Sequence, residues 1–402
     1  MNAPGPATLS IVNALIFDGV SAELTEGGVQ AADGVITGLD PGTTAADVVI
    51  DARGGTVVPG LIDAHFHAYG ISLDPLENEA SQLSYVALAG ARRLAAALRR
   101  GFTTVRDVAG GDAGLARAIA HGLIPAPRYL FTGPALSQTG GHGDPRPPEL
   151  DFCGCGGRGC EVVDGVDALR RAVRERFRQG AHAIKLMTSG GVISPADPIR
   201  VPQYSASEIA AVAEETARRG SYVAAHAYSP EAIVHSVENG VRSIEHGNLL
   251  DAGTAALMAE HGAFLVPTLA AYDALARRGP GLGLAPVAQA KNREVLDAGR
   301  RAIEIAGRAG VRIGFGTDLM GALEDEQLQG LRLQADVAGP LALLRSATSG
   351  NAELLGRDDL GRVAVGAPAD LVVLDRNPLE DPSVLWAGPE HRTVIQGGIP
   401  VP

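Results

Sequence analysis

The chain has 402 residues, which is enough for roughly two to three domains of ordinary size and for a sizeable buried core. Hydrophobic residues make up 46% and charged residues 20%, which is the composition of a folded globular protein and argues against a disordered one. The formal net charge is −12, and the sequence contains no block of basic residues. Because nucleic acids and anionic membranes attract basic surfaces, neither is expected to be a partner.

The N-terminal sequence and the cysteines indicate a cellular compartment. Residues 1–10 lack the basic and apolar regions of a signal peptide, and no stretch approaches the roughly 18 consecutive apolar residues of a membrane span. Only Cys153, Cys155 and Cys160 occur, in one short segment, which is not the pattern of a disulfide framework. Three cysteines also fall one ligand short of a closed zinc site, so their role is left open. We expect a soluble, cytoplasmic protein.

Both ends of the chain predict short strands separated by turn residues. At the N-terminal end the strands are expected at 9–17, 27–31, 35–39 and 48–51. At the C-terminal end they are expected at 361–365, 371–374 and 393–398. We therefore expect residues 1–55 and 361–402 to build one small β-sandwich domain together.

Residues 56–360 alternate between apolar, β-branched runs and helical stretches rich in Ala, Leu, Arg and Glu. This alternation is typical of βαβ units around a parallel sheet. Eight strands are expected, near residues 57–65, 103–107, 129–132, 183–187, 222–226, 243–246, 264–268 and 312–318. Helices are expected at 81–100, 166–179, 206–219, 254–261 and 291–309. The sequence thus predicts an α/β fold, a (β/α)8 TIM barrel that carries the small β-sandwich domain.

One predicted connection, residues 133–164, is much longer than the others. It is rich in Gly and Pro and shows no periodicity. Loops longer than about 15 residues in compact domains are usually functional or disordered. We expect this loop to cap the mouth of the barrel.

Metal-binding side chains stand at the ends of several predicted strands. His65 and His67 end the first strand and, being two residues apart, point to the same side. His226, His246 and Asp318 end the fifth, sixth and eighth strands. A lone histidine on a strand is more often a core or surface residue, but these five meet at the carboxyl-terminal face, where barrel enzymes place their chemistry. The sequence therefore predicts a metal site there.

Two basic residues on other strands belong to the same analysis. Lys185 ends the fourth strand among apolar neighbours, a setting that lowers the pKa of an ammonium group and leaves a nucleophilic amine. Arg106 ends the second strand. It could form an ion pair within the barrel or bind a substrate carboxylate, and we favour the ion pair.

Seven segments spread over the predicted barrel carry a resemblance to a known family. They are 58–67 (VPGLIDAHFH), 101–107 (GFTTVRD), 140–144 (GGHGD), 184–191 (IKLMTSGG), 225–228 (AHAY), 244–247 (IEHG) and 316–318 (GTD). The chain resembles the amidohydrolase superfamily, and within it the Xaa-Pro dipeptidase-like branch of binuclear dipeptidases and carboxypeptidases, with its ochratoxin-hydrolysing relatives. Residues 369–374 resemble the closing strand of the family's β domain.

This resemblance implies a centre of two divalent metal ions. One ion would be held by His65, His67 and Asp318, and the other by His226 and His246. Lys185, carboxylated by carbon dioxide, would bridge them, and its added negative charge would offset part of the cationic charge. Nitrogen and oxygen ligands suit zinc, although manganese and cobalt fit the same ligand types.

The resemblance also implies a mechanism. A hydroxide between the metals would be the nucleophile, and Asp318 would carry its proton to the leaving amine. His142, in the long loop, and Tyr228, two residues after His226, would contact substrate oxygens. Both side chains are expected to face the mouth of the barrel.

The predicted activity is hydrolysis of the amide bond of dipeptides or N-acyl amino acids with release of the C-terminal amino acid, with ochratoxin A as a candidate substrate. The alternative is a mononuclear cyclic-amide hydrolase of the imidazolonepropionase type, which has no use for a carboxylated lysine on the fourth strand. Lys185 therefore favours the binuclear enzyme. A scaffold without activity is disfavoured because every ligand position is filled. We expect a homo-oligomer with a small-molecule or dipeptide substrate.

Overall fold

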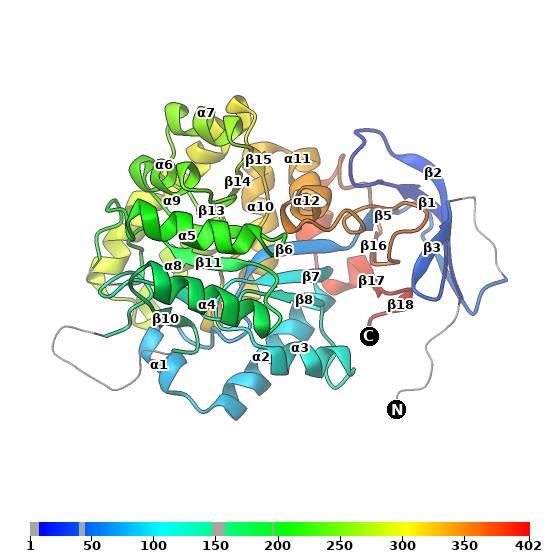
Figure 1. Ribbon diagram of the computed structural model, residues 1–402. Coiled ribbons are helices and arrows are strands. Elements are labelled where there is room, and N and C mark those ends of the chain that lie inside the picture. Colours follow the sequence, from blue (N-terminus) through cyan, green and yellow to red (C-terminus); the bar gives the residue numbers. More distant parts are fainter. Residues whose placement is uncertain (1–7, 40–44, 147–156, 195–196) are drawn as a thin grey trace.

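The computed structural model describes residues 8–39, 45–146, 157–194 and 197–402. One mixed sheet joins the two ends of the chain (Figure 1). It contains eight strands: β1 (Thr8–Ile16), β2 (Thr25–Ala32), β3 (Val35–Gly38), β4 (Val48–Asp51), β5 (Thr56–Pro59), β16 (Leu371–Leu374), β17 (Arg392–Gln396) and β18 (Ile399–Pro400). Strand β16 pairs antiparallel with β5, with Leu371 opposite Pro59. Segments from both ends of the chain are therefore hydrogen-bonded in one sheet, which we call the end sheet.

The central part of the chain forms two parallel sheets. The smaller contains β6 (Leu61–Phe66), β7 (Phe102–Asp107) and β8 (Arg128–Phe131). The larger has the order β10 (Cys160–Val162), β9 (Ala135–Ser137), β11 (Ile184–Met187), β12 (Val223–Ala227), β13 (Ser243–His246), β14 (Phe264–Val266) and β15 (Arg312–Ile313). Strands β11 to β14 are buried along their whole length. This explains why their sequences are apolar without alternation.

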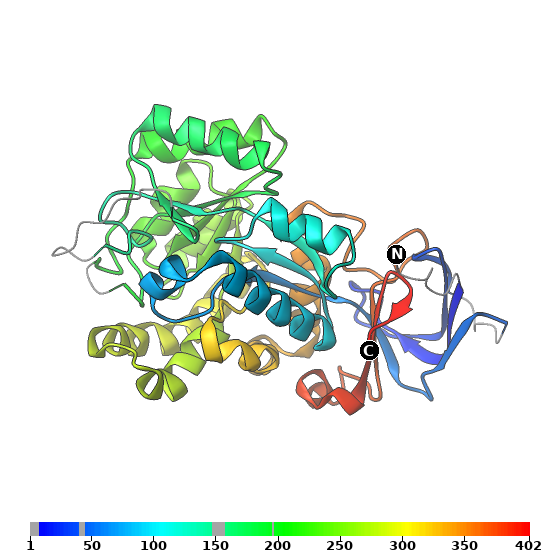
Figure 2. The same cartoon turned by 90° about the horizontal axis from the view of Figure 1, so that it is seen from below.

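Helices alternate with these strands and surround them (Figures 1 and 2). They are α1 (Pro75–Ala80), α2 (Leu83–Arg99), α3 (Ala113–Ala120), α4 (Val166–Arg178), α5 (Ala206–Ala217), α6 (Pro230–Glu238), α7 (Ala252–Glu260), α8 (Leu269–Arg278), α9 (Pro286–Ala309), α10 (Gln327–Ala338), α11 (Pro340–Arg345) and α12 (Asn351–Leu355). The five helices expected from the sequence are confirmed. Figure 2 shows the end sheet lying to one side of this body of strands and helices. None of the described helices is long and apolar enough to cross a membrane.

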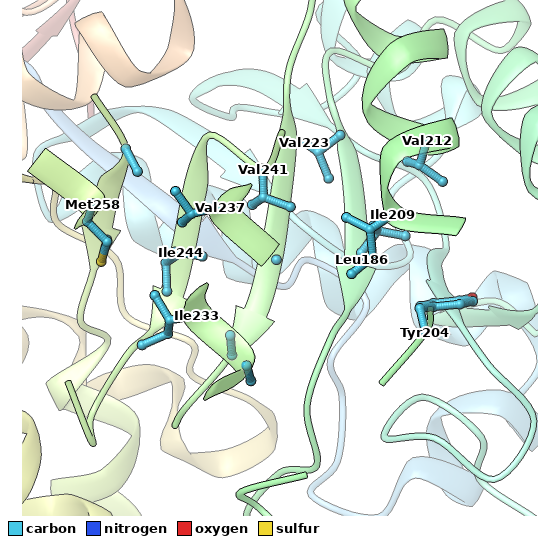
Figure 3. Packing of buried hydrophobic residues seen from close by; sticks show 14 of the residues in the cluster. Leu186, Tyr204, Ile209, Val212, Val223, Ile233, Val237, Val241, Ile244 and Met258 are labelled. Carbon is cyan, nitrogen blue, oxygen red and sulfur yellow. The ribbon is translucent and has the colours of Figure 1, made fainter. Parts of the chain in front are cut away.

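The body is held together by apolar packing between the larger parallel sheet and its helices (Figure 3). Leu186, Val223 and Ile244 project from the strands against Ile209 of α5 and Val237 of α6. Each of these side chains is at most 2% exposed. Burying one side chain of this size stabilises the fold by about 1.5 to 3 kcal/mol. This packing fixes the strands whose carboxyl ends carry the candidate site.

Three of the expected strands differ in the structure. The strand expected at 361–365 is wrong, because these residues form turns and irregular chain before β16. The strand expected at 57–65 is divided at Gly60 into β5 in the end sheet and β6 in the smaller parallel sheet. Of the strand expected at 312–318, only Arg312 and Ile313 pair with β14. The Gly314 N–H still donates to the Leu265 carbonyl of β14, and the chain beyond it hydrogen-bonds to β6, where the Asp318 N–H donates to the His65 carbonyl at 2.8 Å.

The connection 133–164 is also more ordered than expected. Strands β9 and β10 lie at its two ends and pair in parallel with each other. Each has three residues, too few to show a pattern in the sequence. The expectation of a loop without secondary structure was therefore wrong at both ends of the connection.

Candidate metal centre

The carboxyl ends of the parallel strands open into one cavity of about 370 Å³. Its walls include every residue expected at the site: His65, His67, His142, Lys185, His226, Tyr228, His246 and Asp318. Side chains from the connection 133–164, including His142, Asp144, Arg146, Arg158 and Cys160, line it as well. The structure therefore brings together residues that lie far apart in the sequence.

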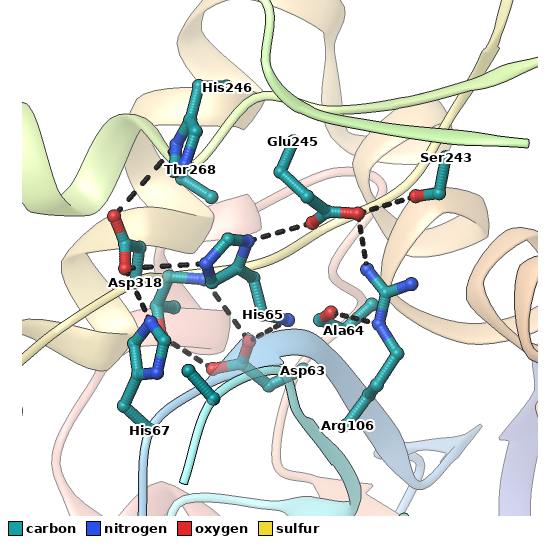
Figure 4. A network of polar contacts seen from close by, with 12 residues as sticks. Asp63, Ala64, His65, His67, Arg106, Ser243, Glu245, His246, Thr268 and Asp318 are labelled. Atoms are coloured by element: carbon teal, nitrogen blue, oxygen red, sulfur yellow. Dashed lines mark hydrogen bonds and ion pairs between the residues drawn. The ribbon is translucent and has the colours of Figure 1, made fainter. Parts of the chain in front are cut away.

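Asp318 is at the centre of the polar contacts in this cavity (Figure 4). Its Oδ1 lies 2.8 Å from His67 Nε2 and 3.4 Å from His65 Nε2, and its Oδ2 lies 3.9 Å from His246 Nδ1. Ligand atoms of His65, His246 and Asp318 all lie within 4.8 Å of one another. Imidazole nitrogens and a carboxylate oxygen are suitable donors for a divalent ion such as zinc, so these residues fit a metal site.

The charge states of these groups also suit a cation. Burial raises the pKa of Asp318, but His65, His67 and His246 more than offset this and hold the pKa well below its usual range. Burial also lowers the pKa of His226 and His246 well below the usual value, with neighbouring histidines adding to the effect. The site thus combines an anionic carboxylate at Asp318 with neutral imidazoles at His226 and His246, the forms that bind metals.

Lys185 lies in the same cavity and is only 2% exposed. Burial lowers the pKa of its ammonium group to about 8, although Glu245 and Asp318 act in the opposite direction. A substantial part of its amine is therefore neutral near physiological pH. The expected lowering of this pKa by apolar surroundings is borne out in direction.

Glu245 is a part of the site to which sequence analysis gave no role. Its Oε2 lies 2.7 Å from His65 Nδ1, and its Oε1 accepts hydrogen bonds from Arg106 Nη2 at 2.7 Å and Ser243 Oγ at 2.5 Å (Figure 4). This contact leaves His65 Nε2 directed at Asp318. Arg106 is fully buried, forms this ion pair with Glu245 and does not line the cavity, in agreement with the ion pair favoured from the sequence.

The backbone takes an unusual conformation at three residues of the centre. His246, Thr268 and Asp318 have φ angles of 76°, 45° and 54°. Such angles are uncommon outside glycine, and for the β-branched Thr268 they are strained. Strain of this kind tends to occur at functional sites. Here it turns the Thr268 hydroxyl to within 2.8 Å of His246 Nδ1.

The two expected substrate-contacting residues stack on the candidate ligands. The His142 ring lies parallel to the His226 ring at 4.2 Å between centroids, and the Tyr228 ring lies parallel to the His246 ring at 5.1 Å. The Tyr228 hydroxyl lies 2.8 Å from the Tyr272 hydroxyl, which itself lies 2.7 Å from His246 Nδ1. Tyr272 had no expected role, because a tyrosine in an apolar helical pattern is indistinguishable from a core residue.

The cysteines offer no second metal site among the described residues. Cys160 is a free thiol at the cavity wall, and burial raises its pKa to about 12. Cys153 and Cys155 lie outside the described residues.

Comparison with known proteins identifies the family. Residues 56–401 match the amidohydrolase family, and the chain belongs to this family. It is 33% identical over 366 residues to the ochratoxinase of Aspergillus niger, covering 85% of this chain and 75% of that protein.

Solved structures of similar proteins point the same way. A prolidase complexed with N-methylphosphonate-L-proline is 43% identical, with a TM-score of 0.95 over 98% of this chain and 99% of that chain. A Xaa-Pro dipeptidase with methionine bound in its active site is 29% identical, with a TM-score of 0.88 over 98% of this chain and 99% of that chain. The chain is therefore a hydrolase of the dipeptidase-like branch of the amidohydrolase superfamily, and this superfamily typically uses divalent metals.

Proposed function

We propose that this enzyme hydrolyses the amide bond of dipeptides or N-acyl amino acids and releases the C-terminal amino acid, with ochratoxin A as a candidate substrate. The observation that carries the proposal is the meeting of Asp318, several histidines and the buried Lys185 in one cavity. It is supported by the similarity to a prolidase that binds a phosphonate analogue of an acyl-proline and to an ochratoxinase. In each of these relatives the name or the ligand points to an amino-acid amide.

The proposed centre holds two divalent ions, taken to be zinc. In this assignment His65, His67 and Asp318 would hold one ion and His226 and His246 the other, and carboxylated Lys185 would be a ligand that both share. Bound ions would polarise the scissile carbonyl and lower the pKa of a water molecule. The buried, partly neutral amine of Lys185 supports carboxylation, because only the neutral amine can react with carbon dioxide.

The protein's own residues would then orient the substrate and move one proton. Asp318 would accept a proton from the attacking water at a carboxylate oxygen and deliver it to the nitrogen of the leaving amine. His142 and Tyr228 would donate hydrogen bonds to substrate oxygens. Since the Tyr228 hydroxyl contacts the Tyr272 hydroxyl, Tyr228 is free to donate to a substrate when Tyr272 donates to Tyr228.

The shape of the cavity supports an apolar acyl group. Much of its wall is apolar, formed by Leu73, Leu76, Val192, Leu275, Met320 and Leu323. Such a wall would favour a neutral or aromatic acyl part over a charged one. The carboxylate of the leaving amino acid would be held by charge-assisted hydrogen bonds from His142 or Tyr228.

We also infer that eight of the ten strands in the two parallel sheets, all except β9 and β10, make one closed barrel between residues 56 and 360. At one seam, the Ala64 N–H donates to the Phe315 carbonyl at 2.9 Å. At the other, the His182 N–H donates to the Phe131 carbonyl at 2.7 Å. These two bonds support closure. The flanking residues 1–55 and 361–402 would form the second domain as a β-sandwich.

The test is a substrate screen with metal content measured on the same sample. Dipeptides and N-acyl amino acids are compared with their carboxyl-amidated analogues. We expect turnover of the free carboxylates and about two metals per chain. Equal turnover of the amidated analogues would contradict a carboxylate pocket, and hydrolysis of cyclic amides with one metal per chain would favour the mononuclear alternative. Lys185→Ala should lose one metal and most activity, whereas unchanged activity would exclude the bridging role.

A further inference from the structure

The position of His142 depends on the chain that follows β11. One face of the His142 ring lies on the His226 ring, with an angle of 18° between their planes. On the other side the ring approaches the backbone so closely that a Cβ at Gly191 would overlap it. Any residue other than glycine at 191 would therefore displace His142 from its place beside the candidate ligand.

Asp197 lies, like Gly191, on the loop that follows β11, and it faces His142. Its side chain is buried, and its Oδ2 lies 3.4 Å from His142 Nδ1. The same oxygen accepts hydrogen bonds from the Gly191 N–H at 3.2 Å and from Gln203 Nε2 at 3.3 Å. The other end of the Gln203 amide, Oε1, accepts a hydrogen bond from the His142 N–H at 3.0 Å. Asp197 and Gln203 thus connect the loop that carries His142 to the loop after β11.

Lys291 of α9 forms hydrogen bonds with the main chain of the loop after β11. Its Nζ donates hydrogen bonds to three main-chain carbonyls, those of Gly191 at 3.0 Å, Ser194 at 2.6 Å and Asp197 at 2.7 Å. An ammonium group has three donors, and all three are used on one short stretch of backbone. These three hydrogen bonds restrain the main chain of the loop and so hold the Asp197 side chain beside His142.

Asp197 and His142 lie close together but do not form a hydrogen bond of good geometry in the structure. His142 Nδ1 and Asp197 Oδ1 are both buried, and neither makes a hydrogen bond of good geometry with another described residue. Buried polar atoms without partners are unfavourable, and contacts between catalytic groups are often long until substrate binds. The geometry therefore leaves room for the two side chains to close on each other.

We propose that Asp197 and Lys291 are positioning residues that act through His142. Lys291 holds the loop, and Asp197 accepts the Nδ1–H of the His142 imidazolium, so that Nε2–H is presented to a substrate oxygen. This inference rests on the proposed function for the identity of the substrate, and it adds two residues outside the metal centre to the machinery of the reaction.

The experiment is a double-variant cycle on the metal-loaded enzyme. Asp197→Asn and Lys291→Met are each measured alone and together with His142→Ala. Alone, each should lower kcat about tenfold, the scale of one hydrogen bond to a charged group, with little change in KM. In the His142→Ala background neither should have a further effect. Asp297→Asn and Arg293→Met, exposed positions on α9, are the matched controls and should behave like the unaltered enzyme.

Gly191→Ala provides a second route to the same result. It leaves both Asp197 and Lys291 intact but places a methyl group where the His142 ring lies. We expect it to reproduce the kcat of His142→Ala with both metals retained. Wild-type kcat in Asp197→Asn or Gly191→Ala, or equal losses in the presence and absence of His142, would overturn the proposal.

A spectroscopic measurement separates this inference from the proposed function. In protein labelled with 15N-histidine, the His142 ring signals are identified by their absence from His142→Ala. Asp197→Asn should shift the 15N signal of His142 Nδ1, because the carboxylate that accepts its N–H is removed, and Asp297→Asn should not. If no dipeptide or N-acyl amino acid is hydrolysed but this change is observed, the proposed substrate is wrong and the positioning role stands. An unchanged His142 signal would overturn the positioning role regardless of activity.

Discussion

Glu245 shows how one buried carboxylate joins the candidate metal centre to the interior of the protein. It accepts hydrogen bonds from a candidate ligand, His65, and from the fully buried guanidinium of Arg106. Burial raises the pKa of Glu245, but Arg106 and His65 more than offset this and hold it well below its usual range. The carboxylate is therefore ionised and compensates a charge that has no access to water.

Replacing Glu245 with Gln should destabilise the protein because it leaves the Arg106 charge without compensation. Breaking a buried ion pair by removing one partner costs about 3 to 5 kcal/mol. We expect a loss of this size in the free energy of unfolding of the metal-free protein, measured with urea. Adding Arg106→Met should recover part of it. Glu294→Gln, whose partner Arg200 is exposed, is the control, and an equal response of the two variants would contradict the role of Glu245.

The lowered pKa of Lys185 has a consequence for stability. The folded protein releases this proton at about pH 8, whereas an unfolded chain holds it until the ordinary value of 10.5. Since the unfolded state binds the proton more tightly, the contribution of Lys185 to stability is fully present above pH 10.5 and is lost as the pH falls through 8. The metal-free protein should therefore become more stable relative to Lys185→Met between these two pH values.

This is measured as the difference between the unfolding free energies of the two proteins across that range. Taking the difference removes the contributions of the tyrosines and Cys160 to the pH dependence, because these groups titrate in both proteins. A difference that does not change with pH would show that the Lys185 amine keeps an ordinary pKa.

At the residue scale, the residues that line the candidate site could be predicted from the sequence, but their hydrogen-bond partners could not. His65, His67, His226 and His246 each end an apolar run, so local pattern was sufficient. Asp197 and Tyr272 join the site through contacts with residues more than 25 positions away, which no local pattern reports. Glu245 did leave a signal, because an acidic residue inside a strand buried throughout requires a partner.

At the scale of elements, the positions of the strands were predictable and the division between sheets was not. A run of apolar residues from 57 to 65 looks like one strand, yet it serves two sheets that meet at Gly60. What divides them is a close approach, since a Cβ at Gly60 would overlap the Thr103 side chain of β7. Such an approach between segments distant in sequence cannot be read from either segment alone.

Gly60→Ala should therefore be destabilising. The methyl group has to displace Thr103 and the backbone at the junction of β5, β6 and β7, and overpacking of this kind costs about 1 to 3 kcal/mol. The control is Gly307→Ala in α9, where a Cβ meets nothing within 4 Å. Because alanine favours a helix over glycine by about 1 kcal/mol, the control should be neutral or stabilising. Thermal unfolding of both variants checks this, and equal effects would contradict it.

At the scale of the whole molecule, one cluster of buried apolar residues spans the end sheet and the body, and the end sheet has a second cluster of its own. Val372 and Leu374 of β16 belong to the same cluster of buried residues as Phe102, Val105 and Phe315 of the body. The main chain is connected as well, since the Gly60 N–H donates to the Asp370 carbonyl at 2.8 Å. The pairing of the two chain ends could be expected from their similar turn-rich patterns. The shared core could not, because it depends on how the two units pack.

A shared core predicts that the C-terminal segment stabilises the entire chain. Truncation after residue 360 removes β16, which lies between β5 and β17, and exposes the β5 edge together with its side of the core. We expect the truncated protein to be insoluble or to lose its N-terminal strands. Leu374→Ala is the milder variant. Its side chain is 1% exposed, and a leucine-to-alanine change in a core costs about 2 to 5 kcal/mol.

If the core is shared, the protein should unfold in one cooperative transition, and Leu374→Ala should lower its midpoint temperature. The transition is monitored by circular dichroism and by the loss of bound metal, and both signals should give the same midpoint. Leu123→Ala, at a position that is 72% exposed, is the control and should leave the midpoint in place. Two separate transitions, with metal retained through the first, would show that the end sheet unfolds independently of the site. A soluble and fully active truncation would lead to the same conclusion, because the metal-binding strands would then need no support from the C-terminal segment.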